Sequence, residues 1–260
     1  MPGMVQQRPT PRWREAAGRG EVAPDELARI IDHTLLKAEA LPADIERLCD
    51  EAVRYGFGAV CVNPVHVPLA VGRLKGTAVR VCTVVGFPLG ATASDVKAAE
   101  AAWCVRRGAQ EVDMVIPVGH LKAGDVEAVE EDVRAVVSAV RGAAGTGARA
   151  AGGPVVKVII EACYLSEGEK VTACRLAAAA GADFVKTSTG FGPFGATVED
   201  VSLMRRAVGE DIGVKAAGGI RDYRTALAMV AAGADRLGMS AGVAVIEEAR
   251  SVFEHGRDEG

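Results

Sequence analysis

The sequence predicts a single-domain α/β protein with the (β/α)8 architecture of a TIM barrel. Eight short apolar runs alternate with Ala-, Glu- and Arg-rich runs of helical spacing, and about 240 residues is close to the usual size of such a barrel. Gly-Ala pairs at 108–109, 181–182 and 233–234 end helices and lead into the next strand. No glycine-rich turn follows the first strand, which disfavours the alternative, a doubly wound nucleotide-binding sheet.

The strands are expected where β-branched residues cluster between glycines and charged helical runs. In order along the chain they are Ile30–Asp32, Ala59–Asn63, Val79–Val85, Glu111–Ile116, Val155–Glu161, Phe184–Thr187, Gly213–Ala217 and Arg236–Gly238.

Four intervening helices have clear patterns, and three of them have recognisable start signals. They are expected over Asp95–Arg107, Asp125–Val140, Lys170–Ala180 and Val198–Val208. Ser94-Asp95 opens the first, Ser166 with Glu169 forms a capping box before the third, and Thr197 with Asp200 resembles one before the fourth.

The predicted barrel occupies residues 23–255. Residues 1–22 contain several arginines, prolines and glycines without an apolar segment, so we predict a flexible N-terminal extension rather than a secretory signal. Residues 256–260 form a short C-terminal tail. The low-complexity run Gly142–Gly153 is expected to be a flexible loop on the N-terminal face, away from the chemistry.

Composition excludes several classes of function. A net charge of −4 and a pI near 5.7 provide no basic surface for nucleic acid. No apolar run approaches the roughly 18 residues that a membrane span needs. The six cysteines form no Cys-x-x-Cys pair and the four histidines have no ligand spacing with them, so we expect reduced core thiols, a cytoplasmic protein and no structural metal.

Polar or charged candidates for the site lie in or at the ends of six predicted strands, and the C-terminal strand ends of a barrel carry its active site. Asp32 and Asn63 end the first two strands, and Asp113 lies in the fourth. Lys157 and Glu161 lie in the fifth, Lys186 in the sixth and Lys215 in the seventh.

Two of these lysines precede turns of small residues, Thr187-Ser188-Thr189-Gly190 and Ala216-Ala217-Gly218-Gly219. A single strand lysine more often reaches outward between helices. Two lysines that converge on one pocket would repel each other, which lowers the pKa of at least one and provides a free amine for Schiff-base chemistry.

Glycine turns after the last two strands favour an anion site. Gly218-Gly219 follows the seventh strand, and Gly238 with Ser240 follows the eighth. In barrels these loops often bind phosphate through backbone N–H groups. Gly-Gly turns are common in other loops, so the prediction of a phosphate site depends on their position after the seventh and eighth strands.

At these residues the chain closely resembles the 2-deoxy-D-ribose-5-phosphate aldolase family of class I (Schiff-base) aldolases. The matching phrases occur in family order between about residues 25 and 250 and are I31-DHTLL-K37, V60-CVN-P64, V84-VGFPL-G90, E111-VDM-V115, K157-VII-E161, F184-VKTSTG-F191 and K215-AAGGI-R221. Their order is more specific than any one phrase.

The resemblance implies roles for individual residues. Lys186 becomes the Schiff-base lysine, Lys215 the cation that keeps it deprotonated, and Asp113 the carboxylate that transfers protons. The remaining residues bind the phosphate or line the site: Gly190, Gly218, Gly219 and Ser240 for the phosphate, and Lys157 and Asp32 in less defined roles.

The implied reaction is reversible cleavage of 2-deoxy-D-ribose 5-phosphate to D-glyceraldehyde 3-phosphate and acetaldehyde, in deoxyribonucleotide catabolism, without a metal or other cofactor. The partners are therefore a small sugar phosphate and an aldehyde. Two departures stand out. Met239 and Ala241 replace hydroxyl residues beside Ser240, and the chain ends without the tyrosine that some members have.

Two alternatives remain at this point. Another class I sugar-phosphate aldolase would keep the Schiff base and use a different donor. A non-catalytic sugar-phosphate-binding barrel would form no imine, and the intact Lys186, Lys215 and Asp113 disfavour it. A homo-oligomer is possible, although no sequence patch identifies an interface.

Overall fold

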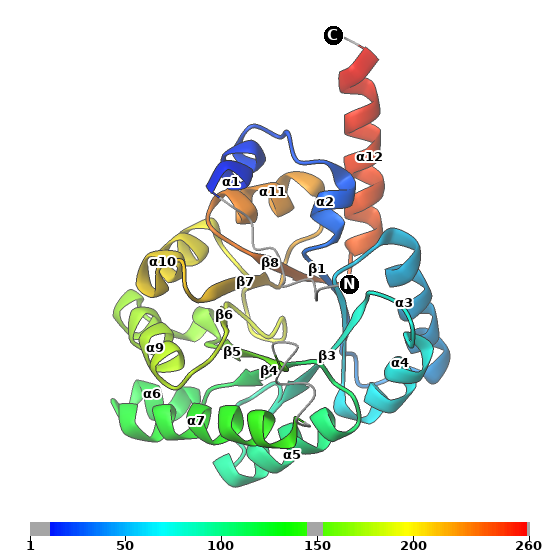
Figure 1. Ribbon diagram of the computed structural model, residues 1–260. Coiled ribbons are helices and arrows are strands. Elements are labelled where there is room, and N and C mark those ends of the chain that lie inside the picture. The colour runs from blue at the N-terminus through cyan, green and yellow to red at the C-terminus, as the bar shows by residue number, and fades with distance from the viewer. Residues whose placement is uncertain (1–10, 145–152, 259–260) are drawn as a thin grey trace.

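The computed structural model describes residues 11–144 and 153–258, and its centre is a closed parallel barrel with strand order β1 to β8 (Figure 1). The strands are β1 Ile31–Leu35, β2 Ala59–Val62, β3 Arg80–Val85, β4 Glu111–Val115, β5 Val155–Ile159, β6 Phe184–Lys186, β7 Gly213–Ala217 and β8 Arg236–Met239. The predicted (β/α)8 fold and all eight predicted strands are confirmed.

Helices surround the barrel and cover its outer face (Figure 1). They are α1 Pro11–Gly18, α2 Pro24–Ala28, α3 Pro42–Tyr55, α4 Val67–Arg73, α5 Ser94–Arg106, α6 Val118–Lys122, α7 Val126–Ala143, α9 Glu167–Ala179, α10 Val198–Val208, α11 Tyr223–Ala231 and α12 Gly242–Asp258. Two short 3-10 turns, η1 Pro64–His66 and η2 Ala162–Tyr164, follow β2 and β5.

The helix starts follow the local signals in the sequence. At α9 the Ser166 side chain accepts a hydrogen bond from the Glu169 N–H, and the Glu169 side chain accepts one from the Ser166 N–H, so the predicted capping box is confirmed. At α10 the Thr197 hydroxyl accepts a hydrogen bond from the Asp200 N–H. These caps fix the point at which the chain leaves each loop on the catalytic face.

Two buried layers follow from the alternation of side chains along each strand. Outward-facing residues such as Val112, Met114 and Val158 belong to the large core cluster between strands and helices. A smaller apolar cluster around Cys61, Cys82 and other residues of β2 and β3 is separate from it. This smaller cluster lies inside the barrel, in the lumen that the strands enclose. Buried charged side chains from β1 and from β4 to β8 face the same lumen, so one side of the lumen is apolar and the other is charged.

Three predicted boundaries are corrected. Residues 11–22 are not a flexible extension, since α1 packs against α11 and Arg14 forms ion pairs with Glu210 at 3.0 Å and Asp235 at 2.8 Å. The predicted tail from 256 is helical up to Asp258. Asp32 does not end the first strand but is its second residue.

Two predicted segments fall partly outside the described residues. These are residues 1–10 of the predicted extension and residues 145–152 of the predicted loop, which precedes β5 at the N-terminal end of the barrel. Within the described ranges, no helix combines the length and apolar character needed to cross a bilayer.

Candidate active site

Seven ionisable side chains from six strands converge in the barrel lumen. Three are carboxylates, Asp32 on β1 and Glu111 and Asp113 on β4. Four are basic, namely Lys157 on β5, Lys186 on β6, Lys215 on β7 and Arg236 on β8, and all seven are buried. Such a density of buried charge requires direct pairing, because an isolated buried ion is strongly unfavourable.

The register of the barrel produces this convergence. Asp113 lies beside Lys157 in the neighbouring strand, Lys186 beside Lys215, and Lys215 beside Arg236. Side chains at paired positions of parallel strands point to the same face, so these residues all enter the lumen. The predicted lysines therefore face inward rather than toward the helices.

Asp113 contacts all three lysines of the cluster. Its Oδ2 atom accepts hydrogen bonds from Lys186 Nζ at 2.9 Å and Lys215 Nζ at 2.7 Å, and its Oδ1 atom accepts one from Lys157 Nζ at 2.8 Å. Burial opposes ionisation of the Asp113 carboxyl, but the three ammonium groups hold its pKa well below the usual range. Asp113 is thus an ionised acceptor that contacts both predicted catalytic amines with one oxygen.

Arg236 and Glu111 complete the cluster, each as the first residue of its strand. The sequence predicts a role for neither of them. Arg236 Nε donates to Asp32 Oδ1 at 3.0 Å, and its Nη2 atom lies 3.3 Å from Glu111 Oε2. Asp32 also pairs with Lys215, and Glu111 pairs with Lys157 at 2.6 Å. The available signal was a charged residue, Arg236, at the start of the predicted eighth strand, where a barrel core normally has apolar side chains.

These carboxylates change the expected effect on the lysines. Burial disfavours the charge on Lys215, yet Asp113 and Asp32 raise its pKa above the usual value. Asp113 likewise contributes to a raised pKa of Lys157 against the effect of burial. The carboxylates therefore outweigh the repulsion between these two lysines and favour the charged form of both.

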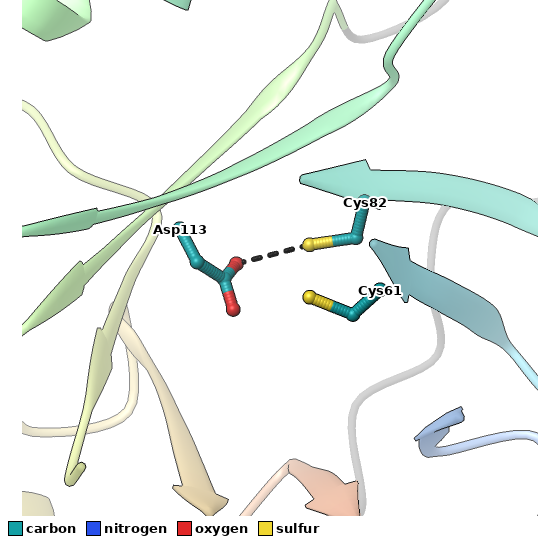
Figure 2. Close-up of side chains that lie close together, drawn as sticks. All are labelled: Cys61, Cys82 and Asp113. Atoms are coloured by element: carbon teal, nitrogen blue, oxygen red, sulfur yellow. Dashed lines mark hydrogen bonds between the residues drawn. The ribbon is translucent and has the colours of Figure 1, made fainter. Parts of the chain in front are cut away.

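Two thiols extend the contacts of Asp113 to the apolar side of the lumen (Figure 2). Cys82 Sγ donates to Asp113 Oδ1 at 3.2 Å and accepts a hydrogen bond from Lys157 Nζ at 3.3 Å. Cys61 lies beside Cys82 in register on β2, and its sulfur atom is within 4.8 Å of both the Cys82 sulfur and the Asp113 carboxylate. The sequence predicts both only as core residues, since a cysteine in an apolar strand carries no sign of its partners.

Three glycines bring the loops after β6 and β7 together above the lysines. A Cβ atom on Gly195 would lie 2.2 Å from the Gly218 carbonyl oxygen, and one on Gly218 would lie 3.5 Å from the Gly190 Cα atom. Gly190 and Gly218 also have positive φ angles of 87° and 86°. Backbone groups can therefore approach a ligand closely at this edge.

The other two predicted phosphate residues lie at the same end of the barrel. Gly219 follows Gly218 with φ 81° and is exposed. Ser240 is exposed directly after β8, where Gly238 pairs with Ala217 of β7. The predicted set of loops thus shares one edge with the lysine cluster.

Glu161 has a different role from the lumen charges. The Thr189 N–H donates to its Oε1 atom at 3.1 Å, and the Thr189 hydroxyl donates to Oε2. The Phe191 N–H in turn donates to the Thr189 hydroxyl at 3.0 Å. Glu161 therefore fixes the loop that follows Lys186.

Two groups of side chains within the described ranges have donor atoms close enough to hold a metal ion. One comprises Cys61, Cys82 and Asp113, and the other comprises Asp32, Cys82 and Glu111. No spacing in the sequence indicated them, because their members come from different strands.

Comparison with known proteins identifies the family. The sequence model described as DeoC/LacD family aldolase matches residues 27–248. The chain belongs to this family.

Individual relatives of this DeoC/LacD aldolase resemble it over nearly their whole length. A protein of Carboxydothermus hydrogenoformans named deoxyribose-phosphate aldolase is 58% identical over 226 residues, which is 87% of this chain and 96% of that one. One of Geobacillus sp. with the same name is 57% identical over 221 residues, 85% of this chain and 95% of that one. The solved tetrameric deoxyribose phosphate aldolase of Aeropyrum pernix is 34% identical, with a TM-score of 0.81 over 94% of this chain and 100% of that chain.

Proposed function

We propose that this DeoC/LacD-family aldolase reversibly cleaves 2-deoxy-D-ribose 5-phosphate to D-glyceraldehyde 3-phosphate and acetaldehyde through a lysine Schiff base. The observation that carries the proposal is the double contact of Asp113 Oδ2, which accepts hydrogen bonds from both Lys186 and Lys215. One proton acceptor between two amines is the arrangement that imine formation and proton transfer require. The near full-length similarity to proteins named deoxyribose-phosphate aldolase supports the substrate.

We assign the nucleophile to Lys186. The buried cluster holds four basic groups and three carboxylates, so the loss of one proton balances its charge. Lys186 has one carboxylate partner, Asp113, whereas Lys157 and Lys215 each have more. Lys186 is therefore the amine held by the fewest carboxylates and the one most available to attack a carbonyl carbon.

Cleavage then follows from the positions of these groups. The Lys186 amine attacks C1 of the open-chain sugar phosphate and, after loss of water, forms an iminium that accepts electrons from the C2–C3 bond. The ionised Asp113 carboxylate takes the C3 hydroxyl proton, directly or through a water, while the Lys215 ammonium stabilises developing negative charge. Protonation of the enamine at C2 and hydrolysis release acetaldehyde.

The glycine edge is the proposed phosphate site. Gly190, Gly218 and Gly219 present backbone groups that no Cβ atom covers, and Ser240 adds an exposed hydroxyl. Lys157 and Asp32 are proposed to support the site from within the lumen, because both are fully buried in the ion cluster.

The cellular setting and assembly are also proposals. The six cysteines are all free thiols, which suits a reducing cytoplasm. The tetrameric relative from A. pernix makes a homo-oligomer reasonable, and light scattering of the purified chain tests it.

Borohydride trapping with acetaldehyde tests the mechanism directly. Reduction of the imine leaves an N-ethyl group on the reacting lysine, and peptide mapping by mass spectrometry locates it. We expect one adduct on Lys186, and none in Lys186→Leu, which should fold normally and lose turnover. An adduct on Lys215 or Lys157 would overturn the assignment of the nucleophile.

The same assay separates the alternative functions. Trapping with dihydroxyacetone phosphate or pyruvate instead of acetaldehyde would indicate another class I aldolase. A folded protein that binds the sugar phosphate but gives no adduct with any carbonyl donor would be a binding barrel.

A further inference from the structure

Cys61, Cys82 and Asp113 form a compact donor set on the apolar side of the lumen. They come from the adjacent strands β2, β3 and β4, and their donor atoms all lie within 4.8 Å of one another. Figure 2 shows both sulfur atoms directed toward the Asp113 carboxyl group. All three side chains are fully buried, so their directions are fixed by packing.

We propose that Cys61, Cys82 and Asp113 form a binding site for a thiophilic divalent cation, for which Zn²⁺ is the best fit, and that occupancy of this site inhibits the enzyme. Two thiolates and a carboxylate are typical Zn²⁺ ligands, whereas Mg²⁺ and Ca²⁺ require oxygen donors.

The spacing suits a shared ion. Zn–S bonds of about 2.3 Å place two tetrahedral sulfur ligands about 3.8 Å apart. The two thiols occupy paired positions of neighbouring strands, and their sulfur atoms already lie within 4.8 Å of each other. One ion between them therefore requires little movement of either strand.

The charges of the cluster also allow binding. Zn²⁺ brings two positive charges and the two thiols each release a proton, so the net charge of the lumen does not change. Lys157 must give up Asp113 Oδ1, which it contacts at 2.8 Å, but it retains Glu111 at 2.6 Å. The Lys157 ammonium, which donates to Asp113 Oδ1 in this structure, therefore keeps a carboxylate partner when the ion binds.

The two oxygens of Asp113 explain why binding would inhibit. Oδ1 faces Cys82 and Lys157, and Oδ2 contacts Lys186 and Lys215. An ion on Oδ1 withdraws negative charge from the carboxylate that the proposed mechanism uses as a base. The inhibition rests on the proposed function, whereas the binding does not.

Co²⁺ and Zn²⁺ added to the full chain test the two parts separately, with a phosphine reductant present to exclude thiol oxidation. Co²⁺ should produce a thiolate-to-cobalt charge-transfer band, and each Zn²⁺ bound should release two protons to an indicator dye. Zn²⁺ should also inhibit acetaldehyde-dependent turnover, and Mg²⁺ should not.

The variants Cys61→Ser and Cys61→Ala should lose the band and weaken inhibition at least about tenfold, each measured against its own uninhibited rate. Cys163→Ser is the matched control, because Cys163 is a more exposed thiol near Glu161. Two Cys61 variants guard against a folding defect in one, and circular dichroism verifies each fold.

The outcomes are distinct. The absence of a band in the folded wild-type protein would overturn the site, and so would a band lost in Cys163→Ser but kept in both Cys61 variants. A band without inhibition would keep the site and overturn its link to Asp113. Failure of the Schiff-base trap would leave the spectroscopic result unaffected and would count against the proposed function alone.

Discussion

Removal of Arg236 should destabilise the barrel from within its lumen. Arg236→Met keeps much of the side-chain volume but deletes the cation that contacts Asp32 at 3.0 Å and Glu111 at 3.3 Å. Both carboxylates are fully buried, and breaking a buried ion pair from one side costs about 3–5 kcal/mol. With about 2–4 °C per kcal/mol for a large domain, the melting temperature should fall by roughly 6–20 °C.

Thermal and urea unfolding at pH 7 measure this effect, and two further variants set its scale. Arg236→Met combined with Glu111→Gln removes one charge of each sign and should recover part of the loss. Arg47→Met removes an exposed arginine paired with Asp44 and should cost less than about 1 kcal/mol.

The pH dependence of the Arg236 variant has a defined sign. Burial opposes ionisation of Asp32, but Arg236, Lys215 and Lys157 lower its pKa below the usual value. That depressed pKa stabilises the fold above a pH of about 4 and the contribution is lost as the pH falls. Wild type and Arg236→Met should therefore begin to converge in stability as the pH falls below about 4, and should converge fully only below the depressed pKa of Asp32. An unchanged melting temperature at pH 7 would refute the role of Arg236 as the compensating cation.

Three further predictions concern the site itself. Lys215→Leu removes a cation beside Lys186, so the pH at which borohydride traps the acetaldehyde adduct should move upward; an unchanged pH profile would contradict the role of Lys215. Ser240→Ala should raise KM for the phosphorylated sugar and leave free deoxyribose unaffected, and equal effects would exclude Ser240 from the phosphate site. Gly195→Ala places a Cβ atom 2.2 Å from a backbone oxygen and should cost about 1–3 kcal/mol and weaken phosphate binding, whereas Gly119→Ala, with open space around it, should change neither.

Local patterns were sufficient to predict the elements and several members of the site. Capping residues such as Ser166 and Thr197 act within one turn of helix, so they can be recognised without tertiary information. The lysines were recognised because Lys186 and Lys215 each precede a turn of small residues at a strand end. Two general rules are enough to place them: side chains alternate along a strand, and the active site of a barrel lies at the C-terminal ends of its strands.

The terminal segments were predicted less well, for a physical reason. Composition indicates that residues 11–22 are polar, but it does not reveal the partners that order them. Arg14 meets Glu210 and Asp235 about two hundred residues later in the chain. Those contacts exist only after the barrel has closed.

The sequence by itself determined the eightfold alternation, the helix caps and the alternation of side chains along each strand, because each depends on residues close together in the chain. Only the tertiary structure decided which inward residues meet. Closure of β8 onto β1 brings Arg236 to Asp32, and the register of β2 to β4 brings two ordinary core cysteines to Asp113. A period of two specifies the face of a side chain but not its neighbour across the lumen, and that neighbour determines its charge state and chemistry.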